Sequence, residues 1–247
     1  MVPLKSQKDL QMLRQSGKIL AAVMRQLEKS IRPGITTLDI DRLSQELILK
    51  NNAIAAFKGY NGYPATACVS VNEEIVHGIP SPRVILEGDI VSIDLGVNYQ
   101  GYFSDMAVTL PVGKVDQKKR KLIEVTKESL DLGIKQARVG NNLTDISHSI
   151  QNFVEAEGFS VVRQFVGHGI GTSLHEEPEI PNFGPPHQGP VLAEGMVLAI
   201  EPMVNIGTHH TKISSDGWTV VTEDGKPSAH FEHTIVITRS GPEILTS

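Results

Sequence analysis

Two segments of the chain repeat a pattern that ends on a carboxylate. Residues 87–94 read EGDIVSID and residues 194–201 read EGMVLAIE, so each is a Glu-Gly pair followed by an apolar run and an acid. A second acid follows each segment, ahead of another apolar stretch. The four acids are Asp94, Asp105, Glu201 and Glu232. Several like charges on apolar strands are costly unless a cation lies among them, so the pattern predicts a metal site.

The first pair of acids is joined by a stretch typical of a tight hairpin, with two glycines and an asparagine between them. If the chain turns at residues 99–100, Asp94 lies directly opposite Asp105, with Cβ atoms about 4.5–5.5 Å apart. Carboxylates at this spacing can bind and bridge two ions about 3.5–4 Å apart. The second pair is joined by a long connection, residues 202–231, so no tight hairpin is expected there. Two divalent ions would neutralise the four carboxylates.

A histidine between glycines is the natural fifth ligand. His168 lies in the segment GHGIG at residues 167–171, where small neighbours let a ligand approach the backbone. A lone histidine is more often a core or loop residue, and glycines can also cradle phosphate, but this spacing does not match the dinucleotide fingerprint. The segment HEEPE at 175–179 lacks the second histidine of a zincin helix, and its proline would break that helix. Oxygen ligands with one imidazole favour manganese, iron(II), cobalt or zinc.

The elements that must position these ligands also repeat. Apolar residues at helical spacing predict a long helix near residues 10–27 and another near 122–137. Each is followed by a segment that runs from Gly to Asp-Ile, at 34–40 and at 140–146, an offset of 106 residues. The two Glu-Gly segments are offset by 107 residues. A nearly constant offset over separate segments indicates a duplicated unit.

The duplication predicts two similar halves, about 1–112 and 113–247, each with two helices followed by strands. Thr36 and Thr144 are expected to cap the second helix of each half. Each half could bury its sheet only against the other, so we predict a single α+β domain with a central antiparallel sheet and helices outside. The acid pairs would then meet near the shared axis.

Composition excludes several classes of protein. The net charge of -5 argues against a dedicated nucleic-acid binder, and the basic run at 118–121 reads as a solvated helix face. No apolar run is long enough to span a bilayer, and the first ten residues lack the core of a signal peptide. Cys68 is the only cysteine, so no intrachain disulfide forms and a cytoplasmic location is expected.

With these residues assembled, the chain closely resembles the type I methionine aminopeptidases over essentially its whole length. The motifs that carry the resemblance are GYNGYPATACVSVNEEIVHGIP (59–80), DLGVNYQGYFSDMAVT (94–109), GHGIGTSLHEEP (167–178), AIEPMV (199–204) and FEHTIVIT (231–238). The resemblance implies the pseudo-twofold pita-bread fold. It also implies two divalent metal ions held by Asp94, Asp105, His168, Glu201 and Glu232, the residues that the charge argument selects.

The resemblance implies a reaction and three catalytic residues. The enzyme would remove the N-terminal methionine of a polypeptide whose second residue is small, through a metal-bridging hydroxide that attacks the scissile carbonyl. Glu201 would take the proton, His175 would stabilise the oxyanion, and His77 would contact the scissile amide nitrogen or assist the leaving amine. Read without the resemblance, each of these two histidines would more often be structural.

A methionine pocket is also implied. The side chains predicted to line or adjoin it are Tyr60, Tyr63, Cys68, Trp218, Phe57 and Leu174, with His77 and His175 in contact with the substrate. Aromatic and sulfur groups suit a thioether. At Phe57 and Leu174 related enzymes often carry Cys and Phe, so this pocket departs from theirs in shape while staying apolar.

The implied substrate is the N-terminus of a nascent polypeptide, which would bring a short, bacterial-type enzyme into transient contact with the ribosome. No dimer patch stands out, and we expect a monomer. Two alternatives remain open. An X-Pro aminopeptidase shares the fold but usually carries an additional N-terminal domain. A non-catalytic binding module would commonly have lost ligands, whereas all five are present here.

Overall fold

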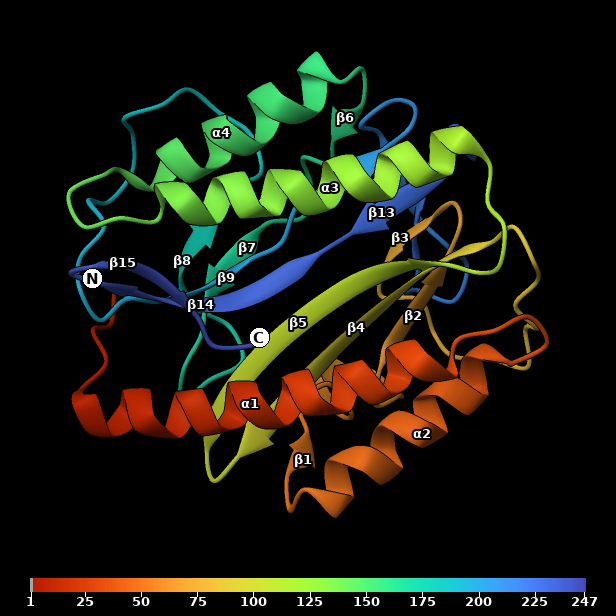
Figure 1. Cartoon of the computed structure of the whole chain (residues 1–247), viewed down its shortest axis with the longest axis horizontal. Coiled ribbons are helices and arrows are strands. Elements are labelled where there is room, and N and C mark those ends of the chain that lie inside the picture. Colours follow the sequence, from red (N-terminus) through yellow and green to blue (C-terminus); the bar gives the residue numbers. More distant parts are fainter. Residues whose placement is uncertain (1) are drawn as a thin grey trace.

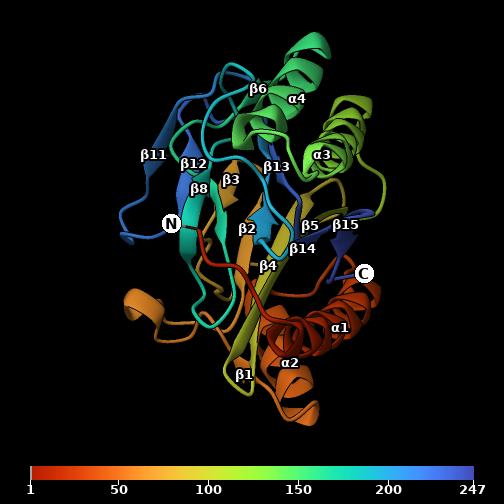
Figure 2. The same cartoon turned by 90° about the vertical axis from the view of Figure 1, so that its left-hand side faces the viewer.

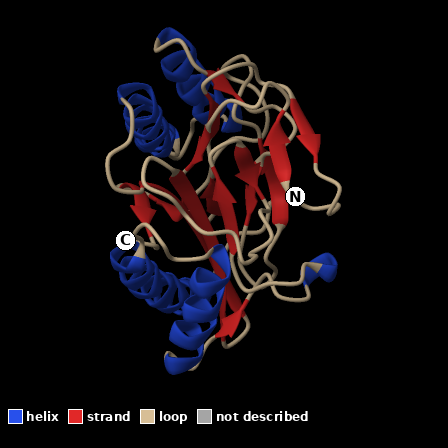
Figure 3. Cartoon of the chain, turned by 90° about the vertical axis from the view of Figure 1, so that its right-hand side faces the viewer, coloured by secondary structure: helices blue, strands red, loops and turns tan. Residues whose placement is uncertain are grey.

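Four long helices and a curled sheet form the computed structural model, which describes residues 2–247. The helices span Gln7–Ser30 (α1), Thr37–Lys50 (α2), Gln117–Gln136 (α3) and Leu143–Ala156 (α4), with a short 3-10 helix at Tyr60–Gly62 (η1). In the view of Figure 1, α1 and α2 lie below the sheet and α3 and α4 above it, so each half contributes one pair. A quarter turn shows both pairs along the same side of the sheet (Figures 2 and 3).

Both predicted long helices are present, but their bounds differ from the prediction: α1 extends three residues beyond 10–27 at each end, and α3 begins five residues before 122 and ends one before 137. Thr36 caps α2, and its backbone N–H and hydroxyl both bond the carboxylate of Asp39. In α4 the capping position is held by Asn142, whose backbone N–H donates to Asp145 at 2.8 Å. The prediction that Thr144 caps α4 was therefore wrong. Its hydroxyl instead donates to the carbonyl of Gln188, because it lies inside the first turn.

One nine-stranded antiparallel sheet crosses both halves. Its main order is β1-β4-β5-β14-β9-β7-β8, with β2 beside β4 and β15 beside β14. These strands span Ile54–Ala55 (β1), Cys68–Val71 (β2), Ile90–Tyr99 (β4), Tyr102–Pro111 (β5), Gly167–Gly169 (β7), Glu176–Ile180 (β8), Val197–Ile200 (β9), Glu232–Thr238 (β14) and Gly241–Ile244 (β15). The two predicted halves, 1–112 and 113–247, are joined where β5 pairs with β14.

Two three-stranded sheets complete the described part of the chain. One has the order β13-β10-β6 and the other β11-β12-β3. Their strands span Glu74–Val76 (β3), Ser160–Val161 (β6), Met203–Asn205 (β10), Thr211–Ile213 (β11), Val220–Thr222 (β12) and Ser228–His230 (β13). The long connection expected between Glu201 and Glu232 therefore forms four of these strands rather than an irregular loop.

The hairpin between β4 and β5 turns one residue later than predicted. Gln100 and Gly101 occupy the turn, and both have positive φ, 52° and 87°, as a two-residue type I′ turn requires. As a result Asp94 faces Ala107 and not Asp105, which pairs with Gly96. The predicted directly opposed pair was wrong. The residue opposite Asp94 lies two positions after the predicted one. Because two is an even number, Asp94 and Asp105 still point to the same face of the sheet and are diagonal neighbours.

The main hydrophobic core fills the space between the helices and the sheet. Leu20 and Leu27 of α1 and Ile134 of α3 belong to one cluster with Ile93 of β4 and Ile235 of β14. Burying such side chains contributes about 1.5–3 kcal/mol each. The predicted α+β class, with a central antiparallel sheet and helices outside, is confirmed. Among residues 2–247, every helix is too short or too polar to cross a membrane.

Candidate metal centre and adjoining pocket

The strand register brings the acids of the two halves together. Residues directly opposite each other in an antiparallel pair point to the same face. Asp94 is opposite Ala107, and Ala107 is in turn opposite Glu232. Asp105 lies two residues before Ala107 and so shares its face. Three carboxylates from three adjacent strands therefore project from one face of the sheet.

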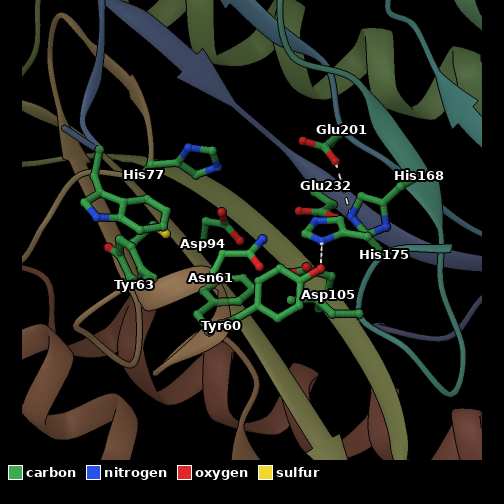
Figure 4. A pocket seen from close by; sticks show the side chains of 14 residues that line it. Tyr60, Asn61, Tyr63, His77, Asp94, Asp105, His168, His175, Glu201 and Glu232 are labelled. Atoms are coloured by element: carbon green, nitrogen blue, oxygen red, sulfur yellow. Dashed lines mark hydrogen bonds and ion pairs between the residues drawn. The ribbon is translucent and has the colours of Figure 1, made fainter. Parts of the chain in front are cut away.

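The next strands add further ligands to that face. His168 in β7 is opposite Ala199 in β9, and Ala199 is opposite Thr234 in β14. Thr234 follows Glu232 by two residues, and Glu201 follows Ala199 by two, so strand alternation keeps all of these side chains on one side. Figure 4 shows the labelled acids and His168 converging from their separate strands.

These carboxylates lie in surroundings that disfavour their charge. Burial, with repulsion from neighbouring acids, raises the pKa of Asp94, Glu201 and Glu232 well above the usual range. Burial also raises the pKa of Asp105 to about 7. Asp94 Oδ1 and Glu232 Oε1 are buried without a hydrogen-bond partner among the described residues. Divalent cations would supply both the missing partners and the missing charge, so these residues fit a metal centre.

The ring of His168 has the orientation of a metal ligand. Its Nδ1 lies 2.9 Å from the carbonyl oxygen of Gly169, which makes Nδ1 the donor. The free lone pair is then on Nε2, which lies 3.6 Å from Glu201 Oε1. Burial lowers the pKa of His168 to about 3, so the imidazole is neutral at physiological pH. A neutral ring fixed through its second nitrogen is the usual form of a ligating histidine.

Two groups of side chains in the described part of the chain could each hold an ion. In each group the ligand atoms all lie within 4.8 Å of one another. The groups are Asp105, His168 and Glu232, and Glu201, His230 and Glu232. Asp94 falls in neither group, although its side chain is close enough for Asp105 and Glu201 to raise its pKa. Glu232 belongs to both groups, as a bridging carboxylate would.

A cavity of about 160 Å³ opens directly onto these ligands (Figure 4). It is lined by every side chain predicted for the site and by one more, Asn61. The predicted residues around it are Phe57, Tyr60, Tyr63, Cys68, His77, Asp94, Asp105, His168, Leu174, His175, Glu201, Trp218 and Glu232. A cavity of about 150 Å³ can hold a group the size of benzene, so this one matches a single side chain.

The wall opposite the acids is apolar and fixed by packing. Trp218 meets Tyr63 edge to face, with ring centroids 5.2 Å apart. The Tyr63 hydroxyl donates to the carbonyl of Gly78 at 2.9 Å, so the ring is held at its far end. Cys68 is directly opposite Asp94 in the sheet, so its thiol marks the boundary between the apolar wall and the acids. Burial raises the pKa of that thiol and keeps it neutral.

Two histidines line the cavity, and in the view of Figure 4 they lie on opposite sides of it. His77 follows β3 with φ at 59°, a left-handed conformation uncommon for a residue with a side chain. Its ring packs edge to face on Phe165, with centroids 5.6 Å apart, and burial lowers its pKa to about 4. Such local strain is often found where a side chain must be aimed at a ligand.

His175 is held by contacts on both sides of its ring. Its centroid is 4.2 Å from that of His168, and its Nδ1 lies 2.8 Å from the hydroxyl of Tyr60. Partial burial of the ring lowers its pKa. The preceding loop is fixed by Glu176, which accepts from the backbone N–H groups of Thr172 and Ser173. With Nδ1 engaged by Tyr60, Nε2 is the nitrogen left to meet a substrate.

Two residues near the site escaped the sequence interpretation. Asn61 lies in the quoted motif at 59–80 and has a positive φ of 48°. The Asn-Gly pair at 61–62 is typical of a turn with this backbone conformation, and it was the signal available in the sequence. His230 precedes Glu232 by two residues, the spacing that places two strand residues on the same face. That spacing was the available signal for His230.

Comparison with known proteins agrees with this site. The sequence matches metallopeptidase family M24 over residues 11–239. This match, together with the fold and the buried acids, identifies the chain as a metal-dependent peptidase. The chain is 53% identical over 247 residues to a methionine aminopeptidase of Clostridium acetobutylicum, covering 100% of this chain and 99% of that one. The crystal structure of a methionine aminopeptidase from Thermotoga maritima superimposes with a TM-score of 0.99 at 49% identity, with both chains fully covered.

A more distant structure shows the same fold alone. Prolidase from Pyrococcus furiosus has a TM-score of 0.81 at 23% identity, and the match covers 99% of this chain and 65% of that one. The predicted pita-bread fold is confirmed by these neighbours. The chain belongs to metallopeptidase family M24 and, within it, to the methionine aminopeptidases.

Proposed function

We propose that this chain is a methionyl aminopeptidase that removes the N-terminal methionine of polypeptides whose second residue is small. The observation that carries the proposal is the shared cavity, with buried carboxylates and His168 on one side and an apolar wall on the other. A methionine side chain against that wall would place its peptide bond beside the acids. The 53% identity to a methionine aminopeptidase over the full length supports the same substrate.

Two divalent ions per chain are proposed, held by the five predicted ligands. The ligands are Asp94, Asp105, His168, Glu201 and Glu232. Their oxygen-rich set suits cobalt, manganese, iron(II) or zinc. When bound, such ions lower the pKa of a coordinated water and polarise a carbonyl oxygen.

The remaining steps fall to side chains at the cavity. Glu201 is only partly exposed and would accept a proton from the attacking water, since burial has raised the pKa of its carboxyl. His175, with Nδ1 bonded to Tyr60, would direct Nε2 at the developing oxyanion. His77, which lies on the other side of the cavity from His175, would hold the scissile amide nitrogen or assist the departing amine.

The apolar wall would select methionine, and crowding near the two histidines would limit the second residue. Phe57, Tyr63 and Leu174 are buried and leave the cavity closed to water on that side. Thioethers make favourable contacts with aromatic rings, and Tyr63 and Trp218 supply two. The next residue of a substrate would lie near His77 and His175, which both line the cavity, and a large side chain there would be disfavoured.

We further propose the setting in which the enzyme works. Residues 1–247 would act as one catalytic domain made of two halves, about 1–112 and 113–247. The nascent-chain substrate implies a cytoplasmic monomer that contacts the ribosome only transiently. Of the basic residues at 118–121, Lys118, Arg120 and Lys121 are exposed, whereas Lys119 is half-buried and donates to the carbonyl of Gly88 at 2.7 Å. A solvated helix face is therefore proposed for the three exposed residues only.

A peptide panel tests the substrate. Metal-reconstituted protein is incubated with Met-Ala-Ser, Met-Leu-Ser and Ala-Pro-Ser, and the released amino acid is quantified. We expect release of methionine from Met-Ala-Ser and little from Met-Leu-Ser, whose second residue is large. Release of alanine from Ala-Pro-Ser without release of methionine would instead support an X-Pro aminopeptidase. Stoichiometric metal binding without cleavage of any peptide would support a binding module.

A further inference from the structure

His230 is a fully buried histidine whose two ring nitrogens have no hydrogen-bond partner among the described residues. Leaving a buried polar atom unpaired costs about 1–3 kcal/mol, so most such atoms find a partner. The five proposed ligands do not include this residue, and it does not line the substrate cavity. Its ring therefore requires an explanation of its own.

The backbone of His230 is clamped, so the direction of its ring is set by the fold. Its N–H donates to the hydroxyl of Thr109 at 2.8 Å, and the same hydroxyl donates to its carbonyl, also at 2.8 Å. On the other side, β13 pairs with β10, where Met203 is opposite His230. Two neighbouring elements thus fix the strand that presents the imidazole. The backbone therefore sets the direction of the imidazole before any ion binds.

The ring points at the carboxylate of Glu201, which lies between two imidazoles. Oε1 of Glu201 is 3.6 Å from His168 Nε2, and Oε2 is 3.8 Å from His230 Nε2. Both separations are too long for a hydrogen bond. They match two ligand atoms on one ion, because bonds of about 2.0–2.2 Å leave neighbouring ligands about 3–4 Å apart. The two histidines thus have equivalent positions with respect to Glu201.

We propose that His230 is a sixth metal ligand, sharing an ion with Glu201 and Glu232. The ligand atoms of these three residues lie within 4.8 Å of one another, as do those of Asp105, His168 and Glu232. Each ion would then be held by one imidazole together with carboxylate oxygens, a donor set that suits manganese, iron(II), cobalt or zinc. This inference rests on the proposed metal centre and extends it.

The test counts the histidines bound to metal. Metal-free protein carrying isotopically labelled histidine is loaded with two equivalents of cobalt(II), and the strongly shifted ring N–H resonances are recorded by NMR. We expect two such resonances in the wild-type protein. His168→Gln should remove one and His230→Gln the other. His233→Gln is the matched control, because His233 is half-buried and adjacent to Glu232 but its Nδ1 bonds Thr246 at 2.8 Å, and it should remove neither.

Cobalt affinity supplies a second readout. Calorimetric titration should show at least about a 10-fold loss of affinity for one of the two equivalents in His230→Gln, with no change in His233→Gln. A wild-type spectrum with a single shifted resonance, lost only in His168→Gln, would overturn the inference while methionine release and cobalt binding stand. If the wild-type protein binds no stoichiometric cobalt, the proposed metal centre fails first. The wild-type count does not depend on any variant folding.

Discussion

The floor and the rim of the active site are built in different ways. The floor is Asp94, Asp105, His168, Glu201 and Glu232. Four strands of the large sheet (β4, β5, β14 and β7) carry four of them, and Glu201 directly follows a fifth strand, β9, which lies between β14 and β7. The rim is Tyr60, His77, His175 and Trp218, carried by segments outside the strands of the large sheet. Backbone ladders hold the floor, whereas single hydrogen bonds and ring contacts hold the rim.

This difference separates two tasks. The register of the sheet places the carboxylates of the floor side by side, although their mutual repulsion is unfavourable. The floor therefore has its geometry before metal binds. The rim orients groups toward a substrate and can be changed without disturbing the sheet. Variants of the floor should therefore lose metal and activity together, and variants of the rim should lose activity alone.

The largest effect is expected from Asp105→Asn. Removing one of the ligand carboxylates should release metal and lower kcat/KM for Met-Ala-Ser by about 10³-fold or more, since metal ions contribute several kcal/mol to transition-state stabilisation. Bound metal is measured together with activity. Asp131→Asn, an exposed acid on α3, is the matched control and should change neither. An Asp105→Asn protein with full activity would break the distinction between floor and rim.

The same variant should stabilise the metal-free protein at high pH. Burial raises the pKa of Asp105 from 3.8 to about 7, so the folded state loses stability as pH rises through that interval. At 1.36 kcal/mol per pKa unit the loss reaches about 4 kcal/mol at most above pH 7 and vanishes below about pH 4. Denaturant unfolding of chelator-treated protein should find Asp105→Asn the more stable at pH 8 and equal to wild type near pH 4. An unchanged difference between the two pH values would contradict this account.

At the rim, His175→Ala should lower kcat by about 10²–10³-fold, the range for losing one oxyanion donor. Metal content should stay at the wild-type level, because this side chain is not on the sheet. Single-turnover cleavage and metal analysis are measured on the same preparation. His187→Ala removes an exposed histidine and serves as control. Normal turnover in His175→Ala would remove it from the reaction.

Tyr60→Phe should have the smallest effect. It keeps the ring and deletes only the hydroxyl that bonds His175 Nδ1, so a loss of about 5–10-fold in kcat is expected, in line with about 1 kcal/mol per hydrogen bond. KM for Met-Ala-Ser should change less than kcat. Tyr102→Phe deletes a comparable hydroxyl bond, to Asp9 and away from the cavity, and should leave both constants unchanged. A change confined to KM would assign Tyr60 to substrate binding alone.

The floor could be predicted from the sequence because strands impose a period of two. Once the repeat aligned Asp94 with Glu201, alternation and pairing were enough to group the acids, even though the hairpin turned at Gln100 and Gly101. That error changed the register by an even number of residues and so left the face of each side chain unaltered. The capping error at Thr144 was equally local.

The rim could not be predicted from spacing. Its residues lie far apart in the chain, and nothing periodic links Tyr60 to His175 or His77 to Trp218. Only the family resemblance selected them, and the cavity gathers them without testing their roles. His230 was missed for a different reason: the fully buried ring becomes conspicuous only when its unpartnered nitrogens are seen beside Glu201.

The most direct test of the central claim is a metal titration of the metal-free protein. Manganese(II) or cobalt(II) is added in steps, and bound metal and release of methionine from Met-Ala-Ser are measured on the same samples. The account predicts no release before metal is added and release that rises in proportion to tightly bound metal. Equal release from the metal-free protein, or saturation with metal and no release, would contradict it.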